Sequence, residues 1–201
     1  RASGSGVIVS NGPGVTYIVT AGHVCEPPNV PKKLRNENVI IETRVTNAIS
    51  IQLFSGARLN STIINIDAIN DLCLLRLDRR VGKVTTVSHR ELTHGEKVYS
   101  LAAPYGMFEP GMVLAFEGRY SGIDLQSGFT FFTVPAQPGS SGSAIVDASG
   151  HVVGIIVAAS RVFEHVGLAI PGPVVYRFVR INGVPGYQDN FNLRQDSQCI
   201  N

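Results

Sequence analysis

The sequence predicts an all-β protein of two packed, six-stranded antiparallel β-barrels that ends in a short helix. The chain has 201 residues, and its 21 glycines and 11 prolines separate short runs that are rich in β-branched residues. Six such runs precede a stretch without a steady apolar period, and six more follow it. This repetition predicts two barrels joined by one linker.

The predicted strands fall into two sets. Residues 79–95, between the sets, mix polar and apolar side chains without a period and are predicted to cross from one barrel to the other. Residues 147–150, Asp-Ala-Ser-Gly, predict a hairpin turn within the second set. The strands of the first set are expected at 4–10, 14–20, 38–46, 48–54, 57–66 and 71–77, and those of the second at 96–102, 111–122, 128–134, 143–147, 151–160 and 164–170.

The pattern changes after Pro171. Residues 173–180 place apolar side chains at helical spacing with a proline near the start, which predicts a helix that packs on a barrel. Residues 182–201 are rich in Asn, Gln, Asp and Gly and are expected to form a loose tail. The domain organisation expected from these patterns is a first barrel over 1–80, a linker over 81–95, a second barrel over 96–171, and a helix with a tail over 172–201.

The composition limits the classes of partner. Hydrophobic residues make up 44% of the chain and charged residues 16%, as in a soluble globular protein with enough apolar material for one or two cores. The formal net charge of +2 comes from 17 basic and 15 acidic residues with no long block of one sign. We therefore expect neither nucleic acid nor a membrane as partner. Compartment and oligomeric state remain open.

A glycine-flanked turn makes Ser141 the candidate nucleophile. The segment 137–144, QPGSSGSA, bends sharply at its glycines and brings backbone N–H groups together beside the hydroxyl. A serine hydroxyl reacts at neutral pH only with a histidine base and an acid that orients the base. His23 follows an apolar strand, and Asp71 opens another. A carboxylate that enters an apolar strand needs a partner, and the imidazole N–H of His23 is a suitable one.

Each of these assignments has an alternative. His23 taken alone is more typical of a histidine that bonds a turn carbonyl at the end of a strand. Asp67, four residues before Asp71, competes for the role of the acid. Ser140 and Ser143 compete with the central serine, which alone lies between the two glycines.

The chain resembles serine proteases of the chymotrypsin fold and is most similar to the protease domain of HtrA-type, trypsin-like peptidases. The order histidine, aspartate, serine along the chain is the order of that fold. Six segments in the order of the family, spread over most of the chain, carry the resemblance: 4–9, 20–24, 67–75, 103–106, 138–143 and 167–171.

The resemblance implies a serine endopeptidase that acts through an acyl-enzyme on a protein or peptide substrate. His23 is then the base, Asp71 its orienting acid, and the N–H groups of Gly139 and Ser141 form the oxyanion hole. Because all these groups belong to the protein, we expect neither a metal nor an organic cofactor.

The chain departs from the family pattern at three places. A serine, Ser143, stands where the family usually has a second glycine, and Ser140 stands where digestive relatives have an aspartate. Activation by insertion of a new N-terminus is therefore not expected. No second domain fits after residue 181, so the chain is expected to be a protease domain alone or a fragment of a longer protein.

The alignment also implies where a substrate lies. The segment 157–159 is expected to be an edge strand to which the substrate adds as an antiparallel strand. An uncharged pocket predicts cleavage after small or medium apolar residues and not after Lys or Arg. A histidine at its mouth leaves cleavage after Gln or Glu as the alternative. The residues assigned to these roles are Val157, Ala158 and Ala159 in the strand, Pro135, Ala159 and Gly167 in the pocket walls, and His165 at the mouth.

Two further functions stay open beside the general endopeptidase. One is a viral or phage protease of the same chemistry that processes a polyprotein. The other is a pseudoprotease that binds peptides without cutting them.

The three cysteines, Cys25, Cys73 and Cys199, lack the spacing of a metal site. Cys25 and Cys73 each follow a candidate site residue by two positions, so they approach each other if His23 meets Asp71. Buried free thiols are the favoured interpretation and a Cys25–Cys73 disulfide is the alternative.

Overall fold

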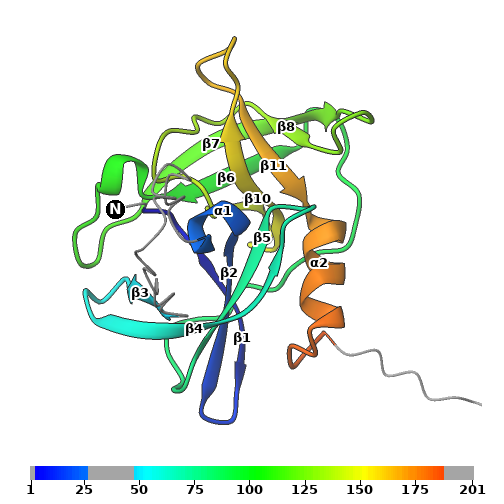
Figure 1. Ribbon diagram of the computed structural model, residues 1–201. Coiled ribbons are helices and arrows are strands. Elements are labelled where there is room, and N and C mark those ends of the chain that lie inside the picture. The colour runs from blue at the N-terminus through cyan, green and yellow to red at the C-terminus, as the bar shows by residue number, and fades with distance from the viewer. Residues whose placement is uncertain (1–2, 27–47, 188–201) are drawn as a thin grey trace, which may run out of the picture.

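The computed structural model describes residues 3–26 and 48–187, in which eleven strands form two β units side by side (Figure 1). The N-terminal unit contains β1 (Val7–Gly12), β2 (Val15–Ala21), β3 (Ala48–Gln52), β4 (Arg58–Asp67) and β5 (Leu72–Leu77). The C-terminal unit contains β6 (Lys97–Ala102), β7 (Leu114–Ile123), β8 (Thr130–Phe132), β9 (Ala144–Asp147), β10 (Val152–Ala159) and β11 (Gly167–Pro171). The helical elements are α1 (Gly22–Cys25), a 3₁₀ turn η2 (Pro104–Gly106) and α2 (Gly172–Ile181).

The C-terminal unit is a closed barrel. Its strands follow the order β10-β11-β8-β7-β6-β9, and every pairing among them is antiparallel. The prediction of a closed six-stranded barrel is therefore confirmed for this half of the chain.

The N-terminal unit is a five-stranded antiparallel sheet in the order β1-β2-β5-β4-β3. Within the described residues this sheet is not closed. The strand predicted at 38–46 lies outside the described residues, so the first of the two barrels stays a prediction.

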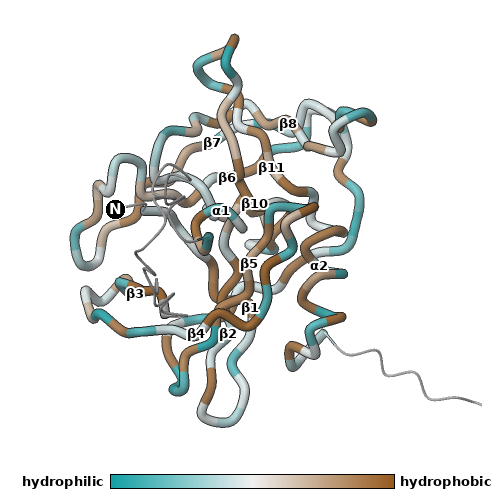
Figure 2. Tube along the Cα trace, in the orientation of Figure 1, coloured by the Kyte–Doolittle hydropathy of each residue, from teal (hydrophilic) through white to brown (hydrophobic). Residues whose placement is uncertain are grey.

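Three apolar clusters hold the fold together. One lies inside the C-terminal barrel, a second lies within the N-terminal sheet, and the third joins the two units and α2. Figure 2 shows apolar residues along the central strands and polar residues at the outer turns. Members of the joining cluster, all buried, include Val19, Leu72, Val87, Ile155, Ile170 and Phe178.

The predicted C-terminal helix is confirmed. In α2 the buried side chains of Val175, Phe178 and Val179 stand three and four residues apart, so they share one face, which packs toward β10 and β11. Pro173 lies in the first turn, where a missing N–H costs no helical hydrogen bond. No helix in the described part of the chain is long and apolar enough to cross a bilayer.

Residues 182–187 are not the loose tail that their composition predicts, and residues 188–201 of the same prediction lie outside the described residues. Val184 and Tyr187 are only 0% and 3% exposed. The Tyr187 hydroxyl donates to the carbonyl oxygen of Val9 at 3.1 Å and accepts from the N–H of Val87 at 2.9 Å. Burial raises the pKa of Tyr187. Residues 182–187 therefore tie the end of the fold to its first strand.

The favoured interpretation of the cysteines is wrong, because Cys25 and Cys73 form a disulfide with their Cα atoms 6.4 Å apart. The cause is the register of the sheet. Ala21, at the end of β2, pairs with Leu72, at the start of β5, so α1, which follows β2 directly, packs against the first residues of β5. Cys25 in α1 and Cys73 in β5 are 6% and 0% exposed.

A charged cluster ties the linker to the turn between β9 and β10. The side chain of Arg90 contacts Glu96, and it donates to Asp147 Oδ2 at 2.9 Å. Asp147 Oδ1 also accepts the N–H groups of Ser149 and His151 at 2.9 and 3.0 Å. Burial raises the pKa of Asp147, but these hydrogen bonds outweigh it and hold that pKa below its ordinary value.

We expect loss of the Cys25–Cys73 disulfide to lower the free energy of unfolding by about 4 kcal/mol, because the bond closes a loop of 48 residues in the unfolded chain. Urea unfolding of the Cys25→Ala, Cys73→Ala double variant measures this. A thiol reductant should destabilise the wild-type protein and leave the double variant unchanged. Equal stability of reduced and oxidised wild type would contradict the expectation.

The Asp147 carboxylate should stabilise the folded protein near neutral pH and lose this effect in acid. Because its folded pKa is lowered, its contribution is complete above the ordinary pKa, about 3.9, and is lost as the pH falls below that value. Thermal unfolding of Asp147→Asn should show a lower melting temperature at pH 6 and a difference from wild type that shrinks toward pH 2. A constant difference over this range would count against the ionic role.

Candidate active site

Asp71 holds His23 by two hydrogen bonds. One carboxylate oxygen, Oδ1, accepts the backbone N–H of His23 at 2.8 Å, and the other, Oδ2, lies 2.8 Å from the ring nitrogen Nδ1. Since a carboxylate only accepts, this contact selects the tautomer of the neutral imidazole in which Nδ1 carries the proton and the opposite ring nitrogen, Nε2, has the lone pair. The His23 side chain is 45% exposed and that of Asp71 30%, so the pair is open to a ligand.

The backbone around this pair requires a glycine. The N–H of Gly22 donates to the carbonyl oxygen of Asp71 at 2.8 Å. A Cβ atom at residue 22 would lie only 2.9 Å from Asp71 Oδ1 and 3.0 Å from the Asp71 carbonyl carbon. Gly22 therefore lets α1 approach the start of β5 closely enough for both contacts with His23.

Asp67 has a different role. Its carboxylate accepts the N–H groups of Ile69 and Asn70 at 3.1 and 3.0 Å and the Asn70 side-chain amide at 2.6 Å. Burial raises the pKa of Asp67, and the hydrogen bonds from Asn70 and Ile69 outweigh this and lower it. The aspartate that contacts His23 is Asp71, while Asp67 stabilises the turn before it.

The turn that carries Ser141 packs against the end of β2, close to His23. Gly142 has a φ of +86°, and a Cβ atom there would lie 2.2 Å from Thr20 Oγ1 and 3.0 Å from the N atom of Ala21. The Ser141 carbonyl oxygen accepts the N–H of Ser5 at 2.7 Å. Ser141 thus lies beside the segment that leads directly into Gly22 and His23.

The three serines of this turn differ in access. Ser140 is 2% exposed and its Oγ accepts the N–H of Gln137 at 3.2 Å. Ser143 is fully buried, and its hydroxyl has no hydrogen-bond partner among the described residues. Ser141 is partly exposed. Of the three hydroxyls, the one most open to a substrate belongs to Ser141.

Two backbone N–H groups of the turn have no acceptor within the described protein, those of Gly139 and Ser141. The N–H groups of Ser140, Gly142 and Ser143 donate to the carbonyl oxygens of Gln137, Ile156 and Ser140 at 2.7–2.9 Å. The two N–H groups without acceptors are therefore those predicted for an oxyanion hole.

Two residues that the sequence analysis did not single out contact this turn. The hydroxyl of Ser5 donates to the carbonyl oxygen of Gly139 at 2.9 Å, and the N–H of Tyr105 donates to that of Pro138 at 2.6 Å. The only sequence signal for either was its place in a segment that carries the family resemblance.

The predicted substrate strand has a free edge. β10 pairs with β11 through Ala159, but its pairing with β9 ends at Ile155. On the β9 side, the described residues include no partner strand for Val157, Ala158 and Ala159. Ala158 and Ala159 are exposed. This edge is available to an added strand.

The predicted pocket residues are only partly brought together. Ala159 and Gly167 are paired across β10 and β11. A Cβ atom at Gly167 would lie 3.3 Å from the Val134 carbonyl oxygen, so Gly167 packs against the residue before Pro135. His165 is exposed in the loop that precedes β11. Pro135 is half-buried.

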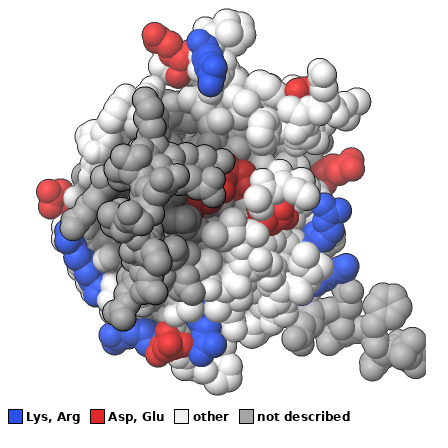
Figure 3. Space-filling view, viewed as in Figure 1, with Lys and Arg blue, Asp and Glu red and all other residues white. Residues whose placement is uncertain are grey.

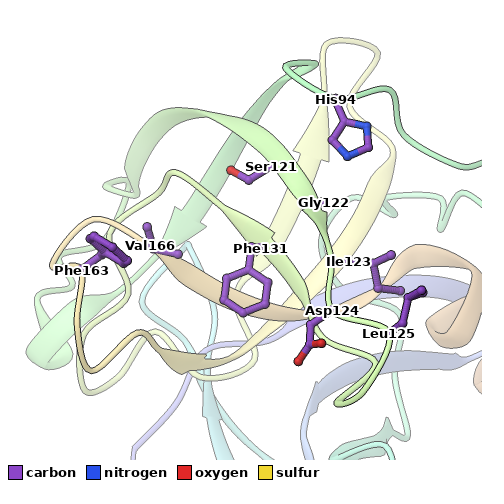
Figure 4. Close-up of a pocket in the computed structure, with 9 residues that line it drawn as sticks. All are labelled: His94, Ser121, Gly122, Ile123, Asp124, Leu125, Phe131, Phe163 and Val166. Atoms are coloured by element: carbon purple, nitrogen blue, oxygen red, sulfur yellow. The ribbon is translucent and has the colours of Figure 1, made fainter.

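One hollow of the surface lies away from these residues. It has a volume of about 590 Å³, lies on the C-terminal barrel and includes His94, Phe131 and Phe163 (Figure 4). None of the residues predicted for the site lines it. Charged residues of both signs are scattered over the described part of the face in Figure 3. No cluster of three or more metal-ligating side chains occurs in residues 3–26 and 48–187.

Comparisons with known proteins agree with this architecture. Residues 4–155 match the model of the trypsin-like peptidase domain. The chain is 28% identical over 182 residues to the serine protease Do-like HtrB of Bacillus subtilis, covering 83% of this chain and 35% of that protein. It is 27% identical over 184 residues to the periplasmic serine endoprotease DegP of Salmonella typhimurium, covering 87% and 34%. The chain thus spans about a third of the length of these relatives.

Solved structures share the fold. The serine endoprotease from Yersinia pestis superposes with a TM-score of 0.68 at 23% identity over 88% of this chain and 56% of that one. The HtrA-type protease AlgW with a decapeptide superposes with a TM-score of 0.67 at 23% identity over 87% and 50%. The resemblance predicted from the sequence is confirmed, and the chain belongs to the family of trypsin-like peptidase domains.

Proposed function

We propose that this domain is a serine endopeptidase in which Ser141, His23 and Asp71 act together. The observation that carries the proposal is the double contact of Asp71 with His23, beside an accessible serine on a turn packed against the same segment. Membership of the trypsin-like peptidase family supports it.

The chemistry follows from the positions of the protons. Ser141 Oγ attacks the carbonyl carbon of the substrate while its proton passes to Nε2 of His23. The Asp71 carboxylate stabilises the imidazolium that forms. The negative charge on the substrate oxygen is met by the N–H groups of Gly139 and Ser141. His23 then protonates the leaving amine. In the second half of the reaction, water attacks the acyl-enzyme while His23 takes a proton from the water, and His23 returns that proton to Ser141 Oγ.

A protein or peptide is the proposed substrate. The unpaired edge of β10 over residues 157–159 suits an extended peptide, which adds as an antiparallel strand and presents the residue before the cut to the region of Ala159 and Gly167. The solved structure of the HtrA-type protease AlgW with a decapeptide supports a substrate of this class, because that protease shares the fold of this chain.

The pseudoprotease and the polyprotein-processing protease are distinguished by two measurements. A fluorophosphonate probe should label the wild-type protein and not Ser141→Ala, whereas a pseudoprotease is not labelled in either form. A polyprotein protease shows the same labelling, and its cut sites map to the borders of its own precursor.

Substitution of the three proposed catalytic residues should abolish turnover without unfolding the protein. Ser141→Ala, His23→Ala and Asp71→Asn are each expected to lower kcat by about 10⁴-fold, because the three groups act as a unit. Peptide hydrolysis measures the rates, and circular dichroism monitors the fold. The matched control is Asp67→Asn, which should keep near-normal kcat because Asp67 bonds only its own turn. The assignment of the acid is wrong if the two asparagine variants behave the other way round.

Cleavage should follow small or medium apolar residues. The walls proposed for the pocket, Pro135, Ala159 and Gly167, carry no charge that could pair with a Lys or Arg side chain. A peptide library compared between wild type and His165→Ala measures the preference. An unchanged apolar profile is expected, whereas cleavage after Gln or Glu that disappears in the variant would assign recognition to His165. Predominant cleavage after Lys or Arg would contradict both the apolar preference and the recognition of Gln or Glu by His165.

A further inference from the structure

The turn from Pro138 to Gly142 is held by its carbonyl groups. The carbonyl oxygen of Pro138 accepts the Tyr105 N–H at 2.6 Å, and that of Ser140 accepts the Ser143 N–H at 2.9 Å. A peptide unit is planar and trans, so its N–H points away from its C=O. The N–H groups of Gly139 and Ser141 belong to these same two peptide units. Each of these N–H groups therefore points away from the hydrogen bond that holds the C=O group of its own peptide unit.

Ser5 holds the peptide unit between them. Its hydroxyl donates to the carbonyl oxygen of Gly139 at 2.9 Å and accepts the N–H of Ala103 at 3.3 Å. The backbone of Ser5 is itself fixed, because its N–H donates to the carbonyl oxygen of Ser141 and its own carbonyl oxygen accepts the Thr20 hydroxyl, both at 2.7 Å. Ser5 thus connects the turn, the segment after β6 and the end of β2.

Tyr105 reaches the turn in an unusual conformation. Its φ of 54° and ψ of 21° lie in the left-handed region, which a bulky residue rarely adopts. Its hydroxyl donates to Gln137 Oε1 at 2.8 Å. The approach to Gly139 is so close that a Cβ atom there would lie 2.8 Å from the Ala103 carbonyl oxygen and 3.0 Å from the Tyr105 N atom. Strained backbone that persists at such a contact points to a functional constraint.

We propose that Ser5 and Tyr105 are positioning residues: Ser5 holds the Gly139–Ser140 peptide, and Tyr105 holds the neighbouring Pro138–Gly139 peptide, whose N–H is directed at the oxyanion. The inference rests on the serine endopeptidase function proposed above. When the two contacts are lost, the Pro138–Gly139 peptide can rotate, which removes one donor and turns the Pro138 carbonyl oxygen toward the developing negative charge. Loss of one such donor lowers kcat by about 100-fold to 1,000-fold in enzymes of this kind. If the turn is loosened and the donor is only partly lost, we expect kcat to fall by part of that factor.

The test compares Ser5, just before β1, with Ser10, within β1. Ser10 is a matched control because its hydroxyl also donates to one backbone carbonyl oxygen, that of Pro185 at 2.6 Å, remote in sequence from the site. Ser5→Ala is expected to lower kcat by about 10-fold or more with KM changed by less than about twofold, since the oxyanion forms only in the transition state. Ser10→Ala should lower the melting temperature and leave kcat unchanged. Ser5→Thr, which keeps the hydroxyl, should restore kcat.

A second measurement does not depend on turnover. Hydrogen exchange at the Tyr105 amide reports its bond to Pro138, and it should be about 10-fold faster in Ser5→Ala than in Ser10→Ala. The proposal is overturned if kcat of Ser5→Ala stays within twofold of the control, or if exchange at Tyr105 is the same in both variants. If the wild-type protein hydrolyses no peptide, the proposed function falls, and the Tyr105 amide still decides whether Ser5 holds the turn.

Discussion

The carboxylate of Asp71 joins the ends of two neighbouring strands, and the geometry of the site depends on it. β2 ends at Ala21 and β5 begins at Leu72, so the antiparallel register brings the residues beyond these ends together. Asp71 then binds both the backbone and the ring of His23, which fixes where α1 starts and how the imidazole points. The absence of a side chain at Gly22 makes this approach possible. The disulfide two residues further along each segment reinforces the same junction.

The site also depends on contact between the two β units. His23 in α1 and Asp71 just before β5 belong to the N-terminal unit, and the turn of Ser141 precedes β9 of the C-terminal barrel. The apolar cluster that includes Val19, Leu72 and Ile155 joins the units, and Gly142 lies against Thr20 and Ala21 without space for a side chain. Relative sliding of the two units would therefore separate the serine from the histidine. The close packing of the shared core prevents such sliding.

The sequence predicted the parts of this arrangement that follow local rules. A serine between two glycines, a histidine after an apolar strand and an aspartate before another are local patterns, and the family resemblance ordered them. Three features were not predicted or were not the favoured prediction. The Cys25–Cys73 disulfide was only the alternative, because spacing along the chain brings the two cysteines near each other without showing whether the strand register lets them bond. The contact of Ser5 with Gly139 joins residues 134 positions apart. Val184 and Tyr187 looked like parts of a polar tail, although both side chains are buried.

Among the described residues, two that are not glycine have a positive φ, Asp71 at 49° and Tyr105 at 54°, and both lie beside the Ser141 turn or its partner histidine. Aspartate tolerates this backbone comparatively well, whereas for tyrosine it is a genuine outlier that costs on the order of 1 kcal/mol. A glycine at residue 105 would adopt this backbone without strain, but it would lack the hydroxyl that binds Gln137 and would give a more mobile backbone beside the turn. Relief of backbone strain and retention of this contact therefore favour different residues at the same position.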